Sequence, residues 1–218
     1  MNEQKILDEI SKSGLVPLFT HKDIEIAKKT VDACYEAGIR VFEYTNRLPN
    51  SFDVFKSLKL YTEKYPDLIF GIGTIFTVKD AERYLYAGAD FIISPAMISE
   101  VAHYCFQRGV MYIPGCATVT EVYQAITSGS ILVKVFPGNV LGPAFIKSVL
   151  SVLPEVKLMA TGGVSPDEEN LKSWFDSGVF CVGMGSQLFN ATEMESGNFD
   201  GLKNRVKGSL NIIQKIKR

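Results

Sequence analysis

The chain has few of the residues that bind metals or form disulfides. Its 218 residues include two histidines, His21 and His103, and four cysteines. The cysteines are far apart and form no Cys-x-x-Cys pair, so neither a disulfide framework nor a thiolate zinc site is indicated. Two separated histidines cannot supply a His-rich catalytic metal site, and we therefore expect no resident metal and no cofactor. A metal bound only by carboxylates and substrate stays open.

The chain also has no large excess of charge of either sign and no long apolar runs. The formal net charge is -1, so no basic surface for nucleic acid or for an anionic membrane is expected. No apolar run reaches membrane-spanning length, and residues 1–5 lead into an amphipathic helix rather than a signal-peptide core. These features predict a cytoplasmic protein. A hydrophobic content of 46% over this length predicts a single domain over residues 1–218.

Apolar strand patterns alternate with helix patterns eight times, and glycine follows most of the helices. This alternation predicts parallel strands joined by right-handed crossovers. We expect an α/β fold, a single (β/α)8 TIM barrel with an extra N-terminal helix. The expected strands are Leu15–Phe19, Ile39–Tyr44, Leu68–Ile72, Phe91–Ile93, Met111–Ile113, Ile131–Phe136, Lys157–Ala160 and Phe180–Val182. The expected helices cover about 3–12, 23–37, 51–65, 78–87, 98–108, 119–127, 143–153, 167–176 and 199–216.

An open doubly wound sheet is the alternative fold. It would be expected to carry a glycine-rich dinucleotide turn after an early strand. The segment Leu15 to Lys22 contains no glycine, which favours the barrel.

The sixth predicted strand contains a lysine, Lys134, within an apolar run that ends at Pro137-Gly138. An unpaired charge inside a domain costs several kcal/mol unless it is paired or deprotonated. Burial lowers the pKa of a lysine, and the neutral amine is a nucleophile. Alternatively, Lys134 extends to the end of the strand or pairs with a carboxylate.

In a barrel of this kind the active site forms at the carboxyl ends of the strands, so polar residues there are candidates. Glu43 lies near the end of the second predicted strand and would face the same opening as Lys134, where a carboxyl group can transfer the protons that imine chemistry requires. Arg47 follows and can offer two parallel hydrogen bonds to a carboxylate. A strand-end acid and a surface ion pair are the alternatives for these two residues.

Glycines follow the seventh and eighth predicted strands. Thr161-Gly162-Gly163 and Gly183-Met184-Gly185-Ser186 would let backbone N–H groups approach an anion, with a short helix N-terminus behind them. This is the usual position of a phosphate site in such barrels. Tight turns without a ligand are the alternative.

The motifs Glu43-x-x-x-Arg47, Gly71-x-Gly73-Thr74, Ser94-Pro95, Pro114-Gly115-x-Ala117-Thr118, Val133-Lys134-x-Phe136-Pro137 and Thr161-Gly162-Gly163-Val164 occur in this order over nearly the whole chain. Together they resemble the class I 2-keto-3-deoxy-6-phosphogluconate (KDPG) / 4-hydroxy-2-oxoglutarate (KHG) aldolases. The resemblance implies an aldehyde-lyase with a Schiff-base lysine at Lys134 and a general acid/base at Glu43. It further implies a homotrimer without metal. Implied substrate contacts come from Arg47, Thr74, Pro95, Phe136 and Thr161, and implied phosphate contacts from Gly162, Gly163, Gly185 and Ser186.

The resemblance implies cleavage of KDPG to pyruvate and D-glyceraldehyde 3-phosphate, or of KHG to pyruvate and glyoxylate. Departures leave the substrate open, because Asn46 places a polar amide next to Arg47 and Ala160 precedes Thr161 where proline is frequent. 2-Keto-3-deoxy-6-phosphogalactonate, the epimer, would use the same lysine. Two further alternatives share the glycine loops without an imine: a sugar-phosphate isomerase or epimerase, and a non-catalytic phosphosugar-binding barrel.

Overall fold

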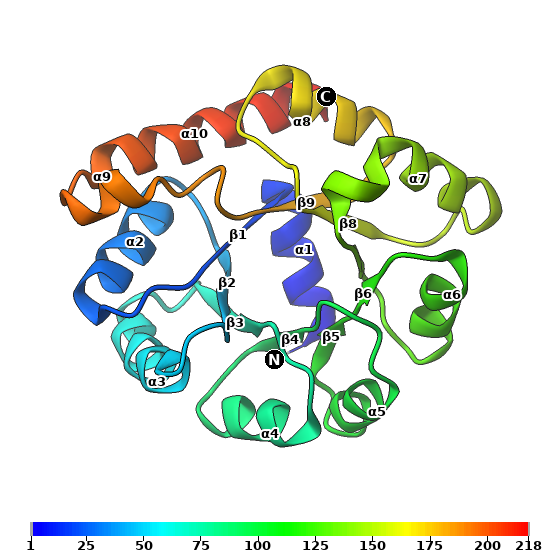
Figure 1. Cartoon of the computed structure of the whole chain (residues 1–218), viewed down its shortest axis with the longest axis horizontal. Helices are drawn as coiled ribbons and strands as arrows, with labels where there is room; N and C mark the ends of the chain where they lie inside the picture. The colour runs from blue at the N-terminus through cyan, green and yellow to red at the C-terminus, as the bar shows by residue number, and fades with distance from the viewer. Residues whose placement is uncertain (1, 218) are drawn as a thin grey trace.

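Parallel strands form a nearly closed ring with the helices outside it (Figure 1). The structure is a computed structural model and describes residues 2–217. Within this range nine strands form one sheet, and every pairing is parallel. The strands are β1 Leu15–Phe19, β2 Val41–Thr45, β3 Ile69–Gly73, β4 Phe91–Ile93, β5 Met111–Ile113, β6 Gly115–Cys116, β7 Val133–Val135, β8 Leu158–Thr161 and β9 Cys181–Met184.

The order of the strands explains the ring. The sheet runs β5-β4-β3-β2-β1-β9-β8-β7-β6, so that its two edge strands, β5 and β6, are separated in sequence only by Pro114. Proline has no N–H to donate to a ladder. Pro114 therefore separates β5, whose bounds match the predicted fifth strand, from the short strand β6, which was not predicted.

Helices occupy the outside of the ring, apart from α1. They are α1 Glu3–Ser13, α2 Ile24–Glu36, α3 Ser51–Tyr61, α4 Val78–Tyr86, α5 Ser99–Gln107, α6 Val119–Thr127, α7 Gly138–Val152, α8 Glu168–Asp176, α9 Ala191–Glu195 and α10 Phe199–Ile216. Several begin at a side-chain cap: Asp23, Thr77, Thr118 and Asp167 each accept a backbone N–H of the first turn. None of the helices in residues 2–217 is long and apolar enough to span a membrane.

Two predicted helix boundaries were wrong by several residues, and one short helix was missed. The helix predicted from Pro143 begins at Gly138 instead, and Gly142 interrupts it with φ 70° and ψ 172°. The helix predicted to reach Tyr65 ends at Tyr61 and continues as one 3₁₀ turn, Thr62–Lys64. Helix α9 was not predicted, because five residues are too few to show a helical period.

The amino-terminal helix α1 lies across the middle of the ring in Figure 1 and contacts β1, β2 and β9. Its buried residues Ile6, Leu7 and Ile10 form one apolar cluster with side chains from the early part of the strands, among them Val16 and Ile69. Each fully buried aliphatic side chain of this kind contributes about 1.5–3 kcal/mol to folding. The helix thus closes the amino end of the strands, and the opposite end stays available for a site.

Candidate active site

Glu43 and Lys134 are buried inside the ring. Glu43 is the third residue of β2 and Lys134 the second of β7, and their relative exposures are 0% and 2%. Both carboxylate oxygens of Glu43 lack a hydrogen-bond partner among the described residues. A buried polar group without a partner is costly, and such groups concentrate at functional sites. The ring therefore contains an acid and an amine that structural stability alone does not require.

Burial shifts the two groups in opposite directions. It raises the pKa of Glu43, while the positive charges of Lys134 and Arg47 lower it to a smaller extent. Burial lowers the pKa of Lys134, which the Glu43 carboxylate raises and the Arg47 guanidinium lowers. Both shifts favour the uncharged forms. A neutral amine beside a carboxyl group whose pKa is raised is suited to nucleophilic attack with general acid–base assistance.

Gly73 of β3 leaves room for the acid, and Gly71 of the same strand leaves room for Phe91. A Cβ at Gly73 would lie 1.6 Å from Glu43 Oε1, and a Cβ at Gly71 would lie 2.4 Å from the ring of Phe91. Glu43 pairs with Gly71 and Thr45 with Gly73 in the parallel register, so the carboxylate extends over the adjacent strand. Any side chain at Gly73 would displace it.

A pocket of about 600 Å³ opens at the carboxyl ends of the strands. Phe136, whose ring centroid is 5.2 Å from Lys134 Nζ, lies on its wall, as does Leu18, the register partner of Glu43. The buried pair therefore lies next to the inner end of the pocket. The lining also includes the other predicted site residues: Arg47, Thr74, Pro95, Thr161, Gly162, Gly163, Gly185 and Ser186.

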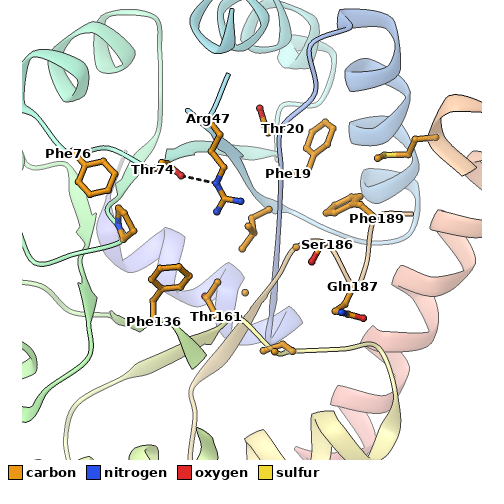
Figure 2. A pocket seen from close by; sticks show the side chains of 18 residues that line it. Phe19, Thr20, Arg47, Thr74, Phe76, Phe136, Thr161, Ser186, Gln187 and Phe189 are labelled. Carbon is orange, nitrogen blue, oxygen red and sulfur yellow. Dashed lines mark hydrogen bonds between the residues drawn. The ribbon is translucent and has the colours of Figure 1, made fainter. Parts of the chain in front are cut away.

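Arg47 and Thr74 lie on one side of this pocket and Phe136 and Thr161 on the other (Figure 2). Arg47 Nε donates to Thr74 Oγ1 at 3.3 Å. Thr74 has φ 65°, a left-handed conformation that is an outlier for a β-branched residue. Such strain, of order 1–3 kcal/mol, persists where the surroundings fix the backbone, and it clusters at binding sites. The buried Thr161 hydroxyl lacks a partner among the described residues.

The glycine-rich end of the pocket differs from the prediction. Instead of a helix behind Gly185, there is one turn in which Leu188 and Phe189 donate backbone hydrogen bonds to the Gly185 carbonyl at 2.8 and 3.2 Å. The N–H groups of Ser186 and Gln187 are outside these two bonds and remain available to an anion. Among the described residues lining the pocket, Arg47 alone carries a charge, so an anion at this end would contact backbone and neutral side chains.

Sequence reasoning missed several lining residues: Leu18, Phe19, Thr20, Phe76, Val164, Gln187, Phe189 and Met194. Thr20 directly follows β1, so the rule that selected the other strand ends would have found it had it been applied to the first strand. Phe189 and Met194 lie beyond the last strand and carry no local signal of a site. Within residues 2–217 no group of three His, Cys, Asp or Glu side chains is arranged to bind a metal ion.

Comparison with known proteins identifies the family. The family model "KDPG and KHG aldolase" matches residues 6–205. The chain is 34% identical over 164 residues to the 2-dehydro-3-deoxy-6-phosphogalactonate aldolase of Escherichia coli K12, covering 74% of this chain and 77% of that protein. It is 32% identical over 204 residues to the 2-dehydro-3-deoxy-phosphogluconate aldolase of Pseudoalteromonas atlantica, covering 93% of both.

Solved structures agree with the sequence relatives. KDPG aldolase from Legionella pneumophila, captured with pyruvate as a covalent carbinolamine intermediate, superimposes with a TM-score of 0.84 at 27% identity. The match covers 92% of this chain and 96% of that one. This barrel-like chain, with its buried amine and acid beside one pocket, belongs to the KDPG and KHG aldolase family of carbon–carbon lyases.

Proposed function

We propose that this chain is a class I aldolase that forms an imine at Lys134 and cleaves KDPG to pyruvate and D-glyceraldehyde 3-phosphate. The observation that carries the proposal is the buried Lys134 beside an unpartnered, buried Glu43 at the inner end of the pocket. Burial favours the neutral amine, which is the form that attacks a carbonyl.

In the first step the Lys134 Nζ lone pair attacks the C2 ketone, whose oxygen takes a proton and becomes the hydroxyl of a carbinolamine. Glu43 then protonates that hydroxyl, which leaves as water, and an iminium remains. Arg47 and Thr74 would bind the substrate carboxylate, and the hydrogen bond that already joins them supports this role. Phe136 lies beside the Lys134 amine and keeps water away from the imine.

In the second step the Glu43 carboxylate, through a water, accepts the proton of the C4 hydroxyl. The C3–C4 bond breaks, its electron pair passes into the iminium to form an enamine, and the aldehyde leaves. Protonation of the enamine at C3 and addition of water to the resulting iminium release pyruvate and restore the Lys134 amine. General acid–base groups contribute about 10²- to 10⁴-fold to such steps.

The phosphate of KDPG would bind the N–H groups around Gly162, Gly163, Gly185 and Ser186, which line the far part of the pocket. KHG, which would yield pyruvate and glyoxylate, has no phosphate and would use the same pair. 2-Keto-3-deoxy-6-phosphogalactonate is the second candidate substrate, supported by the 34% identical relative of that name.

Trapping with sodium borohydride tests the imine. Pyruvate plus borohydride is expected to add one reduced pyruvyl group at Lys134, located by peptide mass spectrometry, and Lys134→Met, which keeps a similar volume, is expected to add none. An adduct on another lysine, or none in the wild type, would overturn the proposal. It would return the isomerase and the non-catalytic binding barrel to consideration.

Substrate choice is tested by measuring kcat/KM for KDPG, its galactonate epimer, the unphosphorylated 2-keto-3-deoxygluconate and KHG. If the glycine end binds phosphate, both phosphorylated substrates should exceed the two without it, because remote binding energy positions the reacting carbons. Ser186→Ala, which removes a side-chain hydroxyl donor but keeps the backbone N–H, should reduce part of this advantage and leave KHG turnover unchanged. Gly163→Val is a poor probe: Gly163 has φ 71°, and its Cβ would lie 2.8 Å from that of Asn139.

We also propose that residues 1–218 form one domain, a (β/α)8 barrel in which β5 and β6 are one strand divided at Pro114, and that it assembles as a homotrimer. The apolar side chains Phe76, Val119 and Val140 are exposed near the carboxyl ends of the strands and would be covered by assembly. A structural neighbour is a cage designed from symmetric oligomeric domains, with a TM-score of 0.83 at 25% identity. Light scattering at about three times the chain mass is the expected result.

A further inference from the structure

The residue that precedes Arg47, Asn46, makes a hydrogen bond between two uncharged side chains. Asn46 Oδ1 accepts from the Tyr84 hydroxyl of α4 at 2.7 Å. We propose that this Tyr84–Asn46 pair is a positioning device that orients Arg47 toward the carboxylate of a 2-keto acid. The inference rests on the proposed function, because the pair would act on that same site through Arg47.

Asn46 is fixed at two points. Its side chain accepts the Tyr84 hydrogen bond, and its backbone N–H donates to the Gly73 carbonyl at 2.9 Å, which extends the β2–β3 ladder by one residue beyond Thr45. The first bond joins the end of β2 to α4 and the second joins it to β3. A residue bonded to two separate elements has little freedom to move. The backbone of Arg47, which follows it, is restricted as well.

Tyr84 is a rigid donor. It is 1% exposed, and its ring packs edge-on against Phe52 at 5.4 Å and Phe55 at 5.1 Å between ring centroids. Burial also raises the pKa of its phenol, so the hydroxyl stays protonated and donates across the whole working pH range. Loss of the Asn46 acceptor would leave a buried hydroxyl without its partner, which costs more than a neutral hydrogen bond contributes.

Arg47 depends on this anchoring because its own contacts are few. Its side chain is exposed, its N–H donates to the Thr45 carbonyl at 3.0 Å, and its Nε donates to Thr74 Oγ1 at 3.3 Å. A long side chain loses much rotamer freedom when it binds a ligand. A fixed starting point at Asn46 reduces the number of directions in which the guanidinium can point, and hence the entropy lost on binding a carboxylate.

The alternative is that the bond only attaches α4 to the sheet. Both interpretations predict some loss of thermal stability on removing the bond. Only the positioning role predicts a change in affinity for a carboxylate. The dependence of imine trapping on pyruvate concentration therefore distinguishes the two interpretations.

The test uses Tyr84→Phe, Asn46→Leu and the double variant, with Tyr104→Phe as the matched control. The Tyr104 hydroxyl of α5 donates to Glu82 Oε1 of α4 at 3.3 Å, and neither residue lines the pocket. The readout is the concentration of pyruvate, or of uncharged methyl pyruvate, that gives half-maximal borohydride trapping at Lys134. A melting temperature accompanies each variant.

Each single variant is expected to raise the half-maximal pyruvate concentration about 3- to 10-fold, the size of one hydrogen bond. The double variant should equal the larger single one, because both changes remove the same bond. Trapping at saturation, the methyl pyruvate response and the control should match the wild type.

Unchanged pyruvate dependence in Tyr84→Phe, or equal changes for pyruvate and its ester, would overturn the positioning role even if the melting temperature fell. If Asn46→Leu does not fold, the result for Tyr84→Phe alone tests the proposal, because this variant removes a single oxygen atom and should keep the fold. Absence of trapping in the wild type would instead reject the proposed function, and this inference with it.

Discussion

The two ends of the strand ring contrast in chemistry. At the amino end, Ile6, Leu7 and Ile10 of α1 pack with strand side chains such as Val16 and Met111 in a wholly apolar cluster. Among residues 2–217, none of the buried polar side-chain atoms without a hydrogen-bond partner lies in this cluster, and its apolar burial favours folding.

The carboxyl end concentrates unfavourable features. A buried acid and a buried lysine lie there, the Glu43 oxygens and the Thr161 hydroxyl lack partners among the described residues, and Thr74 adopts a left-handed backbone. Each lowers stability by an amount of order 1–3 kcal/mol. The apolar end offsets these costs, and so the same barrel can keep reactive groups unpaired. Changes at one end should therefore alter stability and changes at the other should alter chemistry.

Glu43→Gln should give the largest effect on chemistry. The amide has nearly the shape of the acid but cannot exchange protons, so turnover of the preferred substrate should fall by about 10²- to 10⁴-fold. Because burial disfavours the carboxylate, the melting temperature should stay equal or rise. Steady-state kinetics and thermal unfolding measure the two effects, and turnover at the wild-type rate would remove Glu43 from the mechanism.

Ile10→Ala tests the amino end of the strand ring, where a substitution should change stability and leave the chemistry unchanged. Ile10 is fully buried, and its truncation leaves a cavity, so the free energy of unfolding in urea should fall by about 2–5 kcal/mol. Trapping of pyruvate per folded molecule should not change. Leu60→Ala is the control, because Leu60 is 61% exposed and should change stability by at most about 0.5 kcal/mol. A selective loss of trapping in Ile10→Ala would show that the two ends are coupled.

Gly73→Ala should reduce turnover by about 10²-fold, since a misplacement of about 1 Å has this effect and the new Cβ would occupy the position of Glu43 Oε1. Gly208→Ala is the matched glycine: it lies within α10 and a Cβ there meets nothing within 4 Å. That control should keep full activity and gain up to about 1 kcal/mol in unfolding free energy, since alanine favours helices. Equal activity in both variants would mean that the Glu43 side chain can shift away from a Cβ at position 73 without loss of turnover.

Local patterns in the sequence predicted the framework of this comparison. β-Branched apolar runs and helix-stopping glycines identified all eight strand positions, and the bounds of β1, β4, β5, α6 and α10 were correct. The carboxyl-end rule for parallel strands then brought Lys134, Glu43 and the nine predicted binding residues to one region. Their roles stay predictions, because position alone does not establish chemistry.

Other features depend on contacts between distant residues and leave no local pattern. The Tyr84–Asn46 bond joins residues 38 apart in the chain, and nothing near Asn46 indicates that its amide has a partner on α4. The left-handed Thr74 follows a glycine that would itself be the usual residue for that conformation. Phe189 and Met194 reach the pocket through the turn and helix after β9, a segment too short for periodicity to reveal.

The smallest expected effect is a shift in the pH dependence of imine trapping, and it tests the charges of the carboxyl end one at a time. Trapping requires neutral Lys134, so its rate should rise with pH through a pKa that burial places below the ordinary value for lysine. The Glu43 carboxylate raises this pKa by stabilising the ammonium, and the Arg47 guanidinium lowers it by repulsion. Glu43→Gln should therefore move the midpoint of the rate profile to lower pH and Arg47→Gln to higher pH. The Arg47 shift should be the smaller, because that side chain is exposed and solvent screens its charge. The profile is measured by quenching with borohydride at saturating pyruvate over a series of buffers of constant ionic strength. Shifts of the same sign in both variants would show that the two residues act on the fold around Lys134 rather than through their charges.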